Sequence, residues 1–389
     1  MNAPAGLNSP LPGPALGILG GGQLGRMMIL AGRELGLRLH VFDPDPNCCA
    51  GAVADILYPY AYDDHDALKR FADGLDWVTL EFENVPAMAA STLARKLPVR
   101  PNTRALEICQ HRVLEKTFLR ERGIACAPFA IVHDKTGLRS AAQSLGLPAV
   151  LKQAESGYDG KGQCKLESED DFDDAEVLFG GGSCVLEKWI PFRRELSILC
   201  ARRPSGETQV FPLVENIHRN HILHATIAPA DVPESLVRKA EVMARAIAEA
   251  LDYVGLLAVE FFEDADGEIL VNEMAPRPHN SGHYSIDACA HSQFELHCRA
   301  VCAWPLVAPT QRAPAVMVNL LGDLWPSPTE PPDFAPLLSQ PGCHLHLYDK
   351  GEPRAGRKMG HFTVVDPDPR KARERAREIF RALGGEPAF

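Results

Sequence analysis

The sequence lacks any uncharged apolar run of about 18 residues, so we expect no transmembrane helix and no membrane partner. It also lacks CxxC pairs, and its 11 cysteines are scattered and odd in number. This pattern favours reduced thiols in the cytoplasm over a disulfide framework. Residues 1–14 are rich in proline, glycine and asparagine but have no basic residue and no apolar segment. We therefore expect a disordered tail there and not a targeting signal.

The sequence has fewer basic than acidic residues. The 40 lysine and arginine residues are outnumbered by 51 aspartate and glutamate residues, giving a formal net charge of -11. That excess repels nucleic-acid backbones and anionic membranes, which argues against a general nucleic-acid binder but allows a small phosphorylated substrate in a local basic pocket. With 389 residues and 46% hydrophobic content, the chain is long enough for two or three globular domains.

A strand–helix–strand unit is predicted over residues 15–42. A G-x-G-x-x-G motif begins at Gly20, and Asp43 lies near the position of the ribose-binding acid in a dinucleotide fold. The motif alone is weak, because glycines let any ligand approach a helix N-terminus. Gln23 and Arg26 beside it could equally serve a phosphorylated substrate, so both interpretations stay open.

Two further stretches suggest a site. The strand at residues 77–82 ends in Glu81-Phe82-Glu83-Asn84, which fits either a ligand site or a capped helix start. Residues 103–122 predict one helix with Arg112 and Lys116 on the same face.

A lysine inside an apolar strand precedes a glycine-rich loop. Lys152 interrupts the strand at residues 149–153, and a buried lysine is costly unless it meets an anion. The loop from Gly157 to Gln163 contains three glycines and Lys161, and its backbone N–H groups could wrap a phosphate. It lacks Walker A spacing, and a plain hairpin turn is the alternative.

A late hairpin carries two acids. Its turn is predicted at residues 264–267, with Glu260 on the first strand and Glu273 on the second. If Glu263 pairs with Glu268, Glu260 and Glu273 are diagonal neighbours about 7–8 Å apart at the backbone. Two acids on one face of apolar strands repel each other without a cation, so the pair indicates a divalent metal site.

The stretch from Leu270 to Tyr284 holds more charged and hydrogen-bonding groups than a connecting loop needs. Its oxygen ligands suit a metal and its arginine and histidines suit a phosphate, although a satisfied surface loop is the alternative. We expect a site, because ligands tend to bind beyond strand ends. The groups are Asn272, Glu273, Arg277, His279, Asn280, Ser281 and His283.

Three other clusters carry weaker functional signals. The histidines between His218 and His224 match no structural zinc pattern, so a polar loop near the site is preferred. The helix at residues 292–303 carries His297 and two cysteines, and core packing is favoured over a metal. The loop with Lys350, Arg357 and Lys358 is either a solvated surface or an anion site.

Together these features resemble the ATP-grasp superfamily. The stretches GGGQLGRM, EFENVP, GYDGKGQ, NEMAPRPHNSGHY, SQFELHCRA and YDKGEPRAGRKMGH are similar to the 5-(carboxyamino)imidazole ribonucleotide synthase family of purine biosynthesis. The resemblance implies an α/β and α+β fold with an N-terminal Rossmann-like (pre-ATP-grasp) domain at 15–105. It also implies an ATP-grasp domain at 106–305, with its lid subdomain at about 127–190, and a small C-terminal β-rich domain at 306–389. A homodimer is implied as well.

The resemblance implies that ATP, Mg²⁺ and bicarbonate are used to carboxylate aminoimidazole ribonucleotide through carboxyphosphate. Implied ATP contacts are Arg112, Lys152, Gly157, Tyr158, Asp159, Gly160, Lys161, Gly162, Gln163, Glu187, Lys188, Trp189, Ile190, Glu195, His218, Asn272 and Glu273. Implied magnesium ligands are Glu260 and Glu273. Implied ribonucleotide contacts are Gln23, Leu24, Glu81, Asn84, Arg277, His279, Asn280, Ser281, His283, Lys350, Arg357 and Lys358. Implied catalytic groups are Tyr158, Asp159, Lys161 and Arg277. Other ATP-grasp ligases, using formate or biotin, and an NAD-dependent dehydrogenase are the alternatives.

Overall fold

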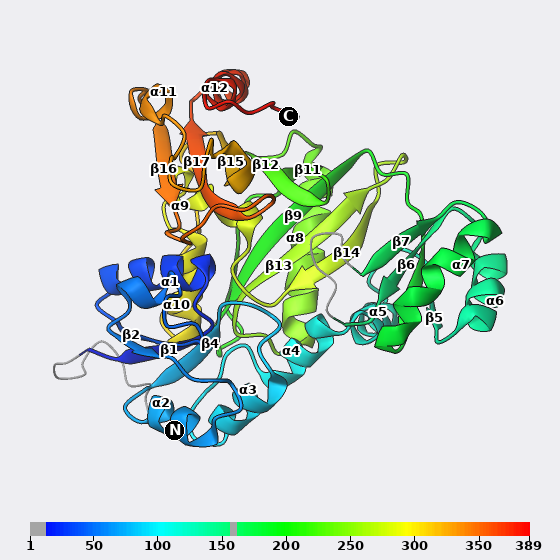
Figure 1. The fold of residues 1–389 in the computed structure, drawn as a ribbon, viewed down its shortest axis with the longest axis horizontal. Helices are drawn as coiled ribbons and strands as arrows, with labels where there is room; N and C mark the ends of the chain where they lie inside the picture. Colours follow the sequence, from blue (N-terminus) through cyan, green and yellow to red (C-terminus); the bar gives the residue numbers. More distant parts are fainter. Residues whose placement is uncertain (1–12, 156–161) are drawn as a thin grey trace.

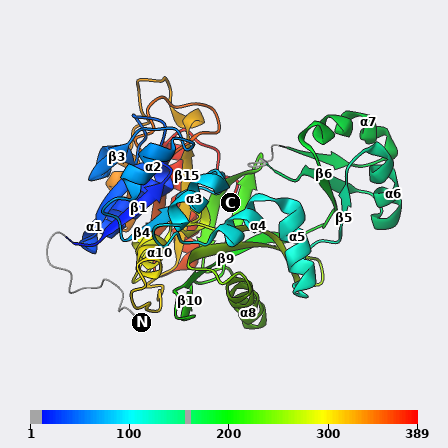
Figure 2. The same ribbon diagram turned by 90° about the horizontal axis from the view of Figure 1, so that it is seen from below.

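The first of three sheets is parallel and lies near the N-terminus. The computed structural model describes residues 13–155 and 162–389 (Figures 1 and 2). The strand order is β3-β2-β1-β4. Apolar residues of α1 and of α10 (Gln293–Val301) pack on one face of the sheet, and those of α2 and α3 pack on the other. Every residue of β1 is therefore buried, as in parallel sheets covered on both faces. The elements are β1 (Ala15–Leu19), α1 (Gln23–Glu34), β2 (Arg38–Phe42), β3 (Ile56–Tyr58), α2 (His65–Ala72), β4 (Trp77–Leu80) and α3 (Ala87–Ala94).

The single helix predicted over residues 103–122 is wrong, because the chain breaks it at His111. The two pieces are α4 (Thr103–Gln110) and α5 (Arg112–Glu121), and His111 has the extended angles φ -125° and ψ 107°. The Arg112 N–H donates to Ala154 O at 2.8 Å instead of to a carbonyl within the helix. That bond ties the start of α5 to the strand that carries Lys152.

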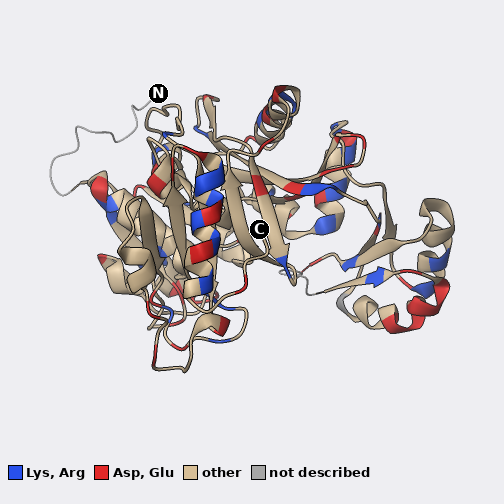
Figure 3. Ribbon diagram, turned by 90° about the horizontal axis from the view of Figure 1, so that it is seen from above, with Lys and Arg blue, Asp and Glu red and all other residues tan. Residues whose placement is uncertain are grey.

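The second sheet is a small antiparallel one that stands apart at the right of Figure 1. Its order is β5-β8-β6-β7, and α6 and α7 pack apolar residues against it. Acidic residues gather around α7 at its outer end, away from the rest of the molecule (Figure 3). The elements are β5 (Phe129–Val132), α6 (Lys135–Leu145), β6 (Ala149–Gln153), β7 (Gln163–Leu166), α7 (Phe172–Ala175) and β8 (Cys184–Lys188).

The third and largest sheet crosses the centre of the molecule in the order β14-β13-β9-β11-β12-β15-β17-β16, and β10 pairs with β9. The long helix α8 packs on one face of it. The C-terminal strands join the same sheet through the β12–β15 pair instead of forming a sheet of their own. The elements are β9 (Arg194–Arg202), β10 (Thr208–Val210), β11 (Val214–Arg219), β12 (Ile222–Ala228), α8 (Glu234–Ala250), β13 (Gly255–Glu263), β14 (Ile269–Ala275), α9 (Ser285–Ala288), α10 (Gln293–Val301), β15 (Ala315–Leu321), α11 (Ala335–Leu338), β16 (Cys343–Leu347), β17 (Lys358–Val365) and α12 (Pro369–Ala382).

Helix α10 packs its thiols and its histidine into the core, as the sequence predicts. Cys298 and Cys302 are fully buried. His297 Nε2 lies 2.8 Å from Thr79 Oγ1, and its Nδ1 accepts the Leu256 N–H at 3.1 Å. With both ring nitrogens bonded to protein, this histidine joins two sheets and is not available to a metal.

Within the described residues, no helix has the length and apolar character needed to span a membrane. All 11 cysteines fall inside those ranges, and each has a free thiol.

Candidate active site

A cavity of about 930 Å³ opens where the three sheets meet. Polar and apolar groups line it in similar measure, and each sheet supplies some of its polar side chains. The first sheet gives Gln23, Leu24, Glu81 and Asn84; the small sheet gives Lys152, Gln163, Glu187, Lys188, Trp189 and Ile190; the large sheet and its loops give Glu195, His218, Glu260, Asn272, Glu273, Arg277, His279, Asn280 and Lys358. Arg112, from α5, also lines it.

The two hairpin acids lie directly opposite each other, which corrects the diagonal register expected from the sequence. Glu260 pairs with Glu273, while Phe261 already pairs with Val271, so a β-bulge leaves Asn272 without a partner residue on β13. A bulge sets two residues against one and re-aims a side chain. As a result Asn272, Glu273 and Glu260 all line the cavity, although neighbours on a regular strand point to opposite sides.

These three side chains fit a hard divalent cation. They offer carboxylate and amide oxygens, the ligands that Mg²⁺ and Ca²⁺ prefer. Asn272 Oδ1 is buried and has no hydrogen-bond partner among the described residues. Burial alone would raise the pKa of Glu260, but His279, which is hydrogen-bonded to it, lowers the pKa to about 2, so the carboxylate is the favoured form.

Cations gather on the side of the cavity next to the small sheet. Arg112 Nη1 lies 3.4 Å from Glu273 Oε2. Lys116 and Lys152 both approach Glu187 Oε2, at 3.3 and 3.1 Å, and all three are buried. Burial lowers the pKa of Lys152 even beside Glu187, whereas that of Lys116 is raised by the nearby carboxylates despite its burial. One carboxylate shared by two lysines leaves room for a further anion at Lys152.

The glycine-rich loop after β1 is already occupied by the protein's own carboxylates. The Gly22 and Gly25 N–H groups donate to Glu81 at 2.9 and 3.1 Å, and the Gly21 N–H donates to Asp43 at 2.7 Å. A Cβ on Gly22 would lie 2.4 Å from Glu81 Oε1, so glycine is required for this contact. The bonds use the amides that a dinucleotide pyrophosphate would need, which argues against the dehydrogenase interpretation.

Arg277 is held by Glu83, an acid that is not among the site residues expected from the sequence. Its Nη2 donates to Glu83 Oε1 at 2.9 Å, and its Nε contacts the other oxygen. Burial opposes ionisation of Glu83, but the Arg277 guanidinium outweighs it and holds the pKa at about 2. The EFENVP stretch pointed to acidic site residues, because Glu81 and Glu83 occupy alternate positions in it. Nothing in the sequence showed which of the two would bind an arginine.

Known proteins resemble the chain over nearly its full length. Family models match at residues 14–110 (ribonucleotide synthetase preATP-grasp domain), 117–294 (ATP-grasp domain) and 315–375 (phosphoribosylaminoimidazole carboxylase C-terminal domain). The N5-carboxyaminoimidazole ribonucleotide synthase of Bacillus subtilis is 42% identical over 96% of this chain and 98% of its own. This chain belongs to the N5-carboxyaminoimidazole ribonucleotide synthase family of ATP-grasp proteins.

Solved structures agree with that assignment. The N5-carboxyaminoimidazole ribonucleotide synthetase of Thermus thermophilus superposes with a TM-score of 0.89 at 44% identity, covering 96% of this chain and 100% of that one. The synthase of Aspergillus clavatus, in complex with ADP and 5-aminoimidazole ribonucleotide, gives 0.86 at 30% identity, covering 96% and 99%. The expected ATP-grasp fold, with its preATP-grasp and C-terminal domains, is thereby confirmed.

Several predicted site residues of this synthase-family chain lie off the cavity wall. Ser281 and His283 are fully buried behind it, which argues against the direct substrate contact expected of them. Arg357 Nη1 bonds the Glu352 carbonyl at 2.9 Å, and neither it nor Lys350 is among the lining residues, unlike Lys358. The sequence could not separate the members of this basic loop, because all three have the same charge. Gly162 is described but does not line the cavity, while Gly157, Tyr158, Asp159, Gly160 and Lys161 lie outside the described residues.

A second group of metal-capable side chains lies away from the cavity in this family member. Asp287, His346 and His361 place ligand atoms within 4.8 Å of one another. The imidazole rings of His346 and His361 are stacked at 15°, so their in-plane lone pairs do not converge on one point. His346 instead bonds Asp287 at 2.9 Å, and His361 bonds the Tyr348 hydroxyl at 2.7 Å. The group therefore fastens α9 to β16 and β17.

Proposed function

We propose that this chain uses ATP and bicarbonate to carboxylate the exocyclic amine of 5-aminoimidazole ribonucleotide, giving 5-carboxyaminoimidazole ribonucleotide, ADP and phosphate in purine biosynthesis. The observation that carries the proposal is the opposition of Glu260 and Glu273 across a bulged hairpin, beside a row of buried cations. Phosphoryl transfer needs positioning and cations more than covalent help from the protein. Family membership supplies the substrates.

The nucleotide is assigned to the cavity between the small sheet and the bulged hairpin. Arg112 and Lys152 contact its phosphates, and the strand end Glu187–Ile190 lines the adenine slot. Glu187 Oε1 is buried without a partner among the described residues, which suits an amine donor such as that of adenine. The ribose is assigned to Glu195, whose Oε2 lies 2.6 Å from His218 Nδ1.

Glu260, Glu273 and Asn272 would hold magnesium. When bound, the ion neutralises charge on the phosphates during transfer. Arg112 would then exchange part of its contact with Glu273 for a phosphate oxygen, which keeps both groups paired.

The ribonucleotide is assigned to the opposite side of the cavity, against Gln23, Leu24, Asn84, Asn280 and Lys358. A bicarbonate oxygen attacks the γ-phosphorus, ADP leaves, and the resulting carboxyphosphate separates into carbon dioxide and phosphate. The amine attacks carbon dioxide and loses a proton, which completes the carbamate. Arg277 and His279 would stabilise the anions, and Glu83 keeps the guanidinium in place.

The loop from Gly157 to Lys161 is assigned as a lid over the terminal phosphates. Carboxyphosphate hydrolyses readily, so the site must exclude water, and this role is assigned to the loop from its sequence, since its residues lie outside the described ranges. Lys161 would add a cation there. Tyr158, Asp159 or a nearby histidine would take the proton of the amine.

We further infer a homodimer in the cytoplasm. The free thiols support a reducing compartment, and the dimer rests on family resemblance alone. Sedimentation of the purified chain tests the dimer.

The proposal is tested by ADP release with magnesium, ATP and bicarbonate, with and without aminoimidazole ribonucleotide. We expect release that depends on the ribonucleotide and is not supported by formate. Equal ADP release with and without the ribonucleotide, or ADP release supported by formate in place of bicarbonate, would favour the activity of another ATP-grasp ligase.

A further inference from the structure

Four buried polar side chains form a hydrogen-bonded row behind the cavity, here called the relay. Thr226 Oγ1 donates to Asn216 Oδ1 at 3.1 Å, and Asn216 Nδ2 donates to Ser197 Oγ at 2.8 Å. Ser197 Oγ donates to Ser281 Oγ at 2.8 Å. Each of the four is at most 3% exposed, and none lines the cavity. These four side chains can therefore affect the reaction only by positioning another residue that does line the cavity.

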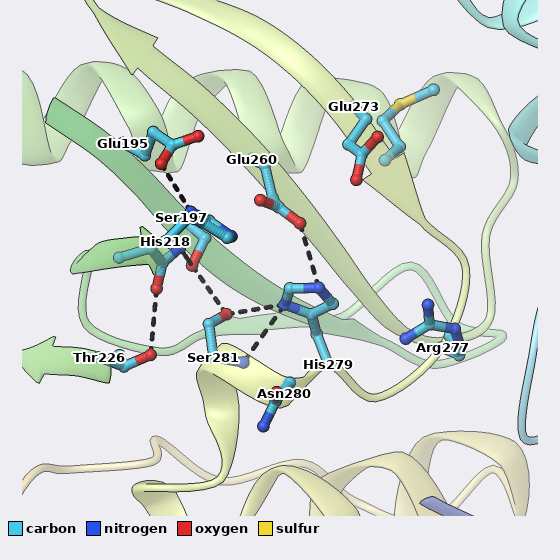
Figure 4. A network of polar contacts seen from close by, with 12 residues as sticks. Glu195, Ser197, His218, Thr226, Glu260, Glu273, Arg277, His279, Asn280 and Ser281 are labelled. Atoms are coloured by element: carbon cyan, nitrogen blue, oxygen red, sulfur yellow. Dashed lines mark hydrogen bonds and ion pairs between the residues drawn. The ribbon is translucent and has the colours of Figure 1, made fainter. Parts of the chain in front are cut away.

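The relay ends on a histidine that meets a proposed metal ligand (Figure 4). Ser281 Oγ lies 2.8 Å from His279 Nδ1, and His279 Nε2 lies 3.1 Å from Glu260 Oε1. Unlike the relay, His279 and Glu260 line the cavity. A continuous path thus runs from the interior of the large sheet to the carboxylate.

The donors and acceptors of the relay run in one direction. A serine hydroxyl has a single hydrogen to donate. Because Ser197 Oγ already accepts from Asn216, its hydrogen points to Ser281, and the hydrogen of Ser281 points to His279 Nδ1. The Ser281 backbone N–H also donates to Nδ1, at 3.4 Å. Both donors require Nδ1 to be unprotonated, which puts the proton of the neutral ring on Nε2.

The opposite direction conflicts with the charge of Glu260. Reversing the Asn216 amide would send every hydrogen the other way and place the proton on His279 Nδ1. The Nε2 lone pair would then lie 3.1 Å from the Glu260 carboxylate, and two acceptors at that distance repel each other. It would also leave the Ser281 N–H without an acceptor on the ring.

We propose that Thr226, Asn216, Ser197 and Ser281 are positioning residues, which hold His279 as the Nε2–H tautomer. That tautomer donates to Glu260 Oε1 and leaves Oε2 available to a divalent cation. The effect on turnover rests on the proposed function, whereas the tautomer itself does not.

The register of the large sheet makes the relay rigid. Ser197 on β9 is directly opposite Glu260 on β13, and Asn216 on β11 is directly opposite Thr226 on β12. Only Ser281 lies outside the strands, in the short 3-10 turn Asn280–Gly282. Groups that position a site from regular strands hold their geometry more closely than groups on loops.

The first test is the ¹⁵N NMR spectrum of ring-labelled histidine in the chain without nucleotide or metal, with His279→Gln to assign the signal. We expect an unprotonated Nδ1 in the wild type and a mixture of tautomers in Ser281→Ala and Thr226→Val. The matched control is Thr363→Val, because Thr363 is an equally buried strand threonine of the same sheet whose hydroxyl has no partner among the described residues. An unchanged tautomer in both relay variants would overturn the proposal.

The second test is kinetic. Ser281→Ala is expected to lower kcat about 10- to 100-fold, the usual effect of removing a group that orients a metal ligand, with both KM values unchanged. Thr226→Ser keeps the hydroxyl and is expected to retain the wild-type tautomer and rate. If Thr226→Val and Thr363→Val slow turnover equally, the relay is only structural and the proposal fails. A tautomer change in a chain whose wild type does not carboxylate the ribonucleotide would support the relay and reject the proposed function.

Discussion

The acidic residues at the cavity differ in how firmly hydrogen bonds and ion pairs fix their side chains. Glu260 is fixed by His279 and Glu83 by Arg277, whereas the side chain of Glu273 is 43% exposed and, within the described residues, meets Arg112 at 3.4 Å. A weakly held carboxylate beside a fixed one is free to adjust to a cation. Glu273 is therefore the residue whose loss should affect the metal most and the fold least.

Replacing Glu273 with alanine should lower ADP release about 100-fold or more, the scale of losing one electrostatic contact to a transition state. The melting temperature should stay near that of the wild type. Glu268→Ala is the control, since Glu268 lies on the same hairpin and its exposed carboxylate pairs with Lys239, away from the cavity. Normal turnover in Glu273→Ala would contradict the metal assignment.

Replacing Lys358 with alanine should raise the KM for the ribonucleotide more than the KM for ATP. Lys358 is the member of the basic loop that lines the cavity. The comparison is Arg354→Ala, because Arg354 is on the same loop and exposed. Steady-state kinetics with each substrate varied in turn measures the effect, and an unchanged ribonucleotide KM would refute the role of Lys358.

The elements show where sequence patterns were sufficient and where they were not. Apolar periodicity identified the hairpin of β13 and β14. It could not find the bulge at Asn272, because the bulge depends on tertiary bonds: the Asn272 carbonyl accepts from Lys116 at 2.8 Å and the Val271 N–H donates to Ala125 at 2.8 Å. The break at His111 likewise depends on a carbonyl of the small sheet.

The buried group of Lys116, Lys152 and Glu187 joins α5 to the small sheet and should give stability a distinct pH dependence. Burial opposes ionisation of Glu187, but the two lysines hold its pKa at about 2. An unfolded glutamate titrates near about 4.3, so the contribution is fully present above that pH and is lost as pH falls toward 2. Its size at neutral pH is about 3 kcal/mol.

Glu187→Gln should therefore be less stable than the wild type at pH 7, and the difference should shrink as pH falls from about 4 to about 2. Urea denaturation across this range measures it. Glu176→Gln is the control, because Glu176 is an exposed residue in the short 3-10 helix that follows α7, next to the same small sheet. A difference that stays constant with pH would show that Glu187 is not held ionised by the lysines.

At the scale of the whole molecule, the large sheet joins the central strands to the C-terminal strands. The predicted boundaries at residues 105 and 305 stay a prediction, and no sequence pattern indicated that β15, β17 and β16 would continue the central sheet. Strand pairing across domains leaves little trace in local periodicity. Beside the β12–β15 pair, Asn280 and Asn319 exchange two buried hydrogen bonds, at 3.0 and 2.7 Å.

We expect the C-terminal strands and the central strands to unfold as one unit. Phe362 on β17 is fully buried, and Phe362→Ala should cost about 3–5 kcal/mol. Hydrogen exchange should then quicken in β9 and β13 as well as in β17. Faster exchange confined to β15, β16 and β17 would show that the C-terminal part unfolds independently.

The most direct test of the proposed reaction follows an oxygen atom. If bicarbonate attacks the γ-phosphorus of ATP in this cavity, one bicarbonate oxygen ends in the released phosphate. With ¹⁸O-labelled bicarbonate, ATP, magnesium and aminoimidazole ribonucleotide, mass spectrometry should find one labelled oxygen per phosphate formed. Phosphate without label would mean that water cleaves ATP directly, and the account of this site as a bicarbonate-phosphorylating ligase would be wrong.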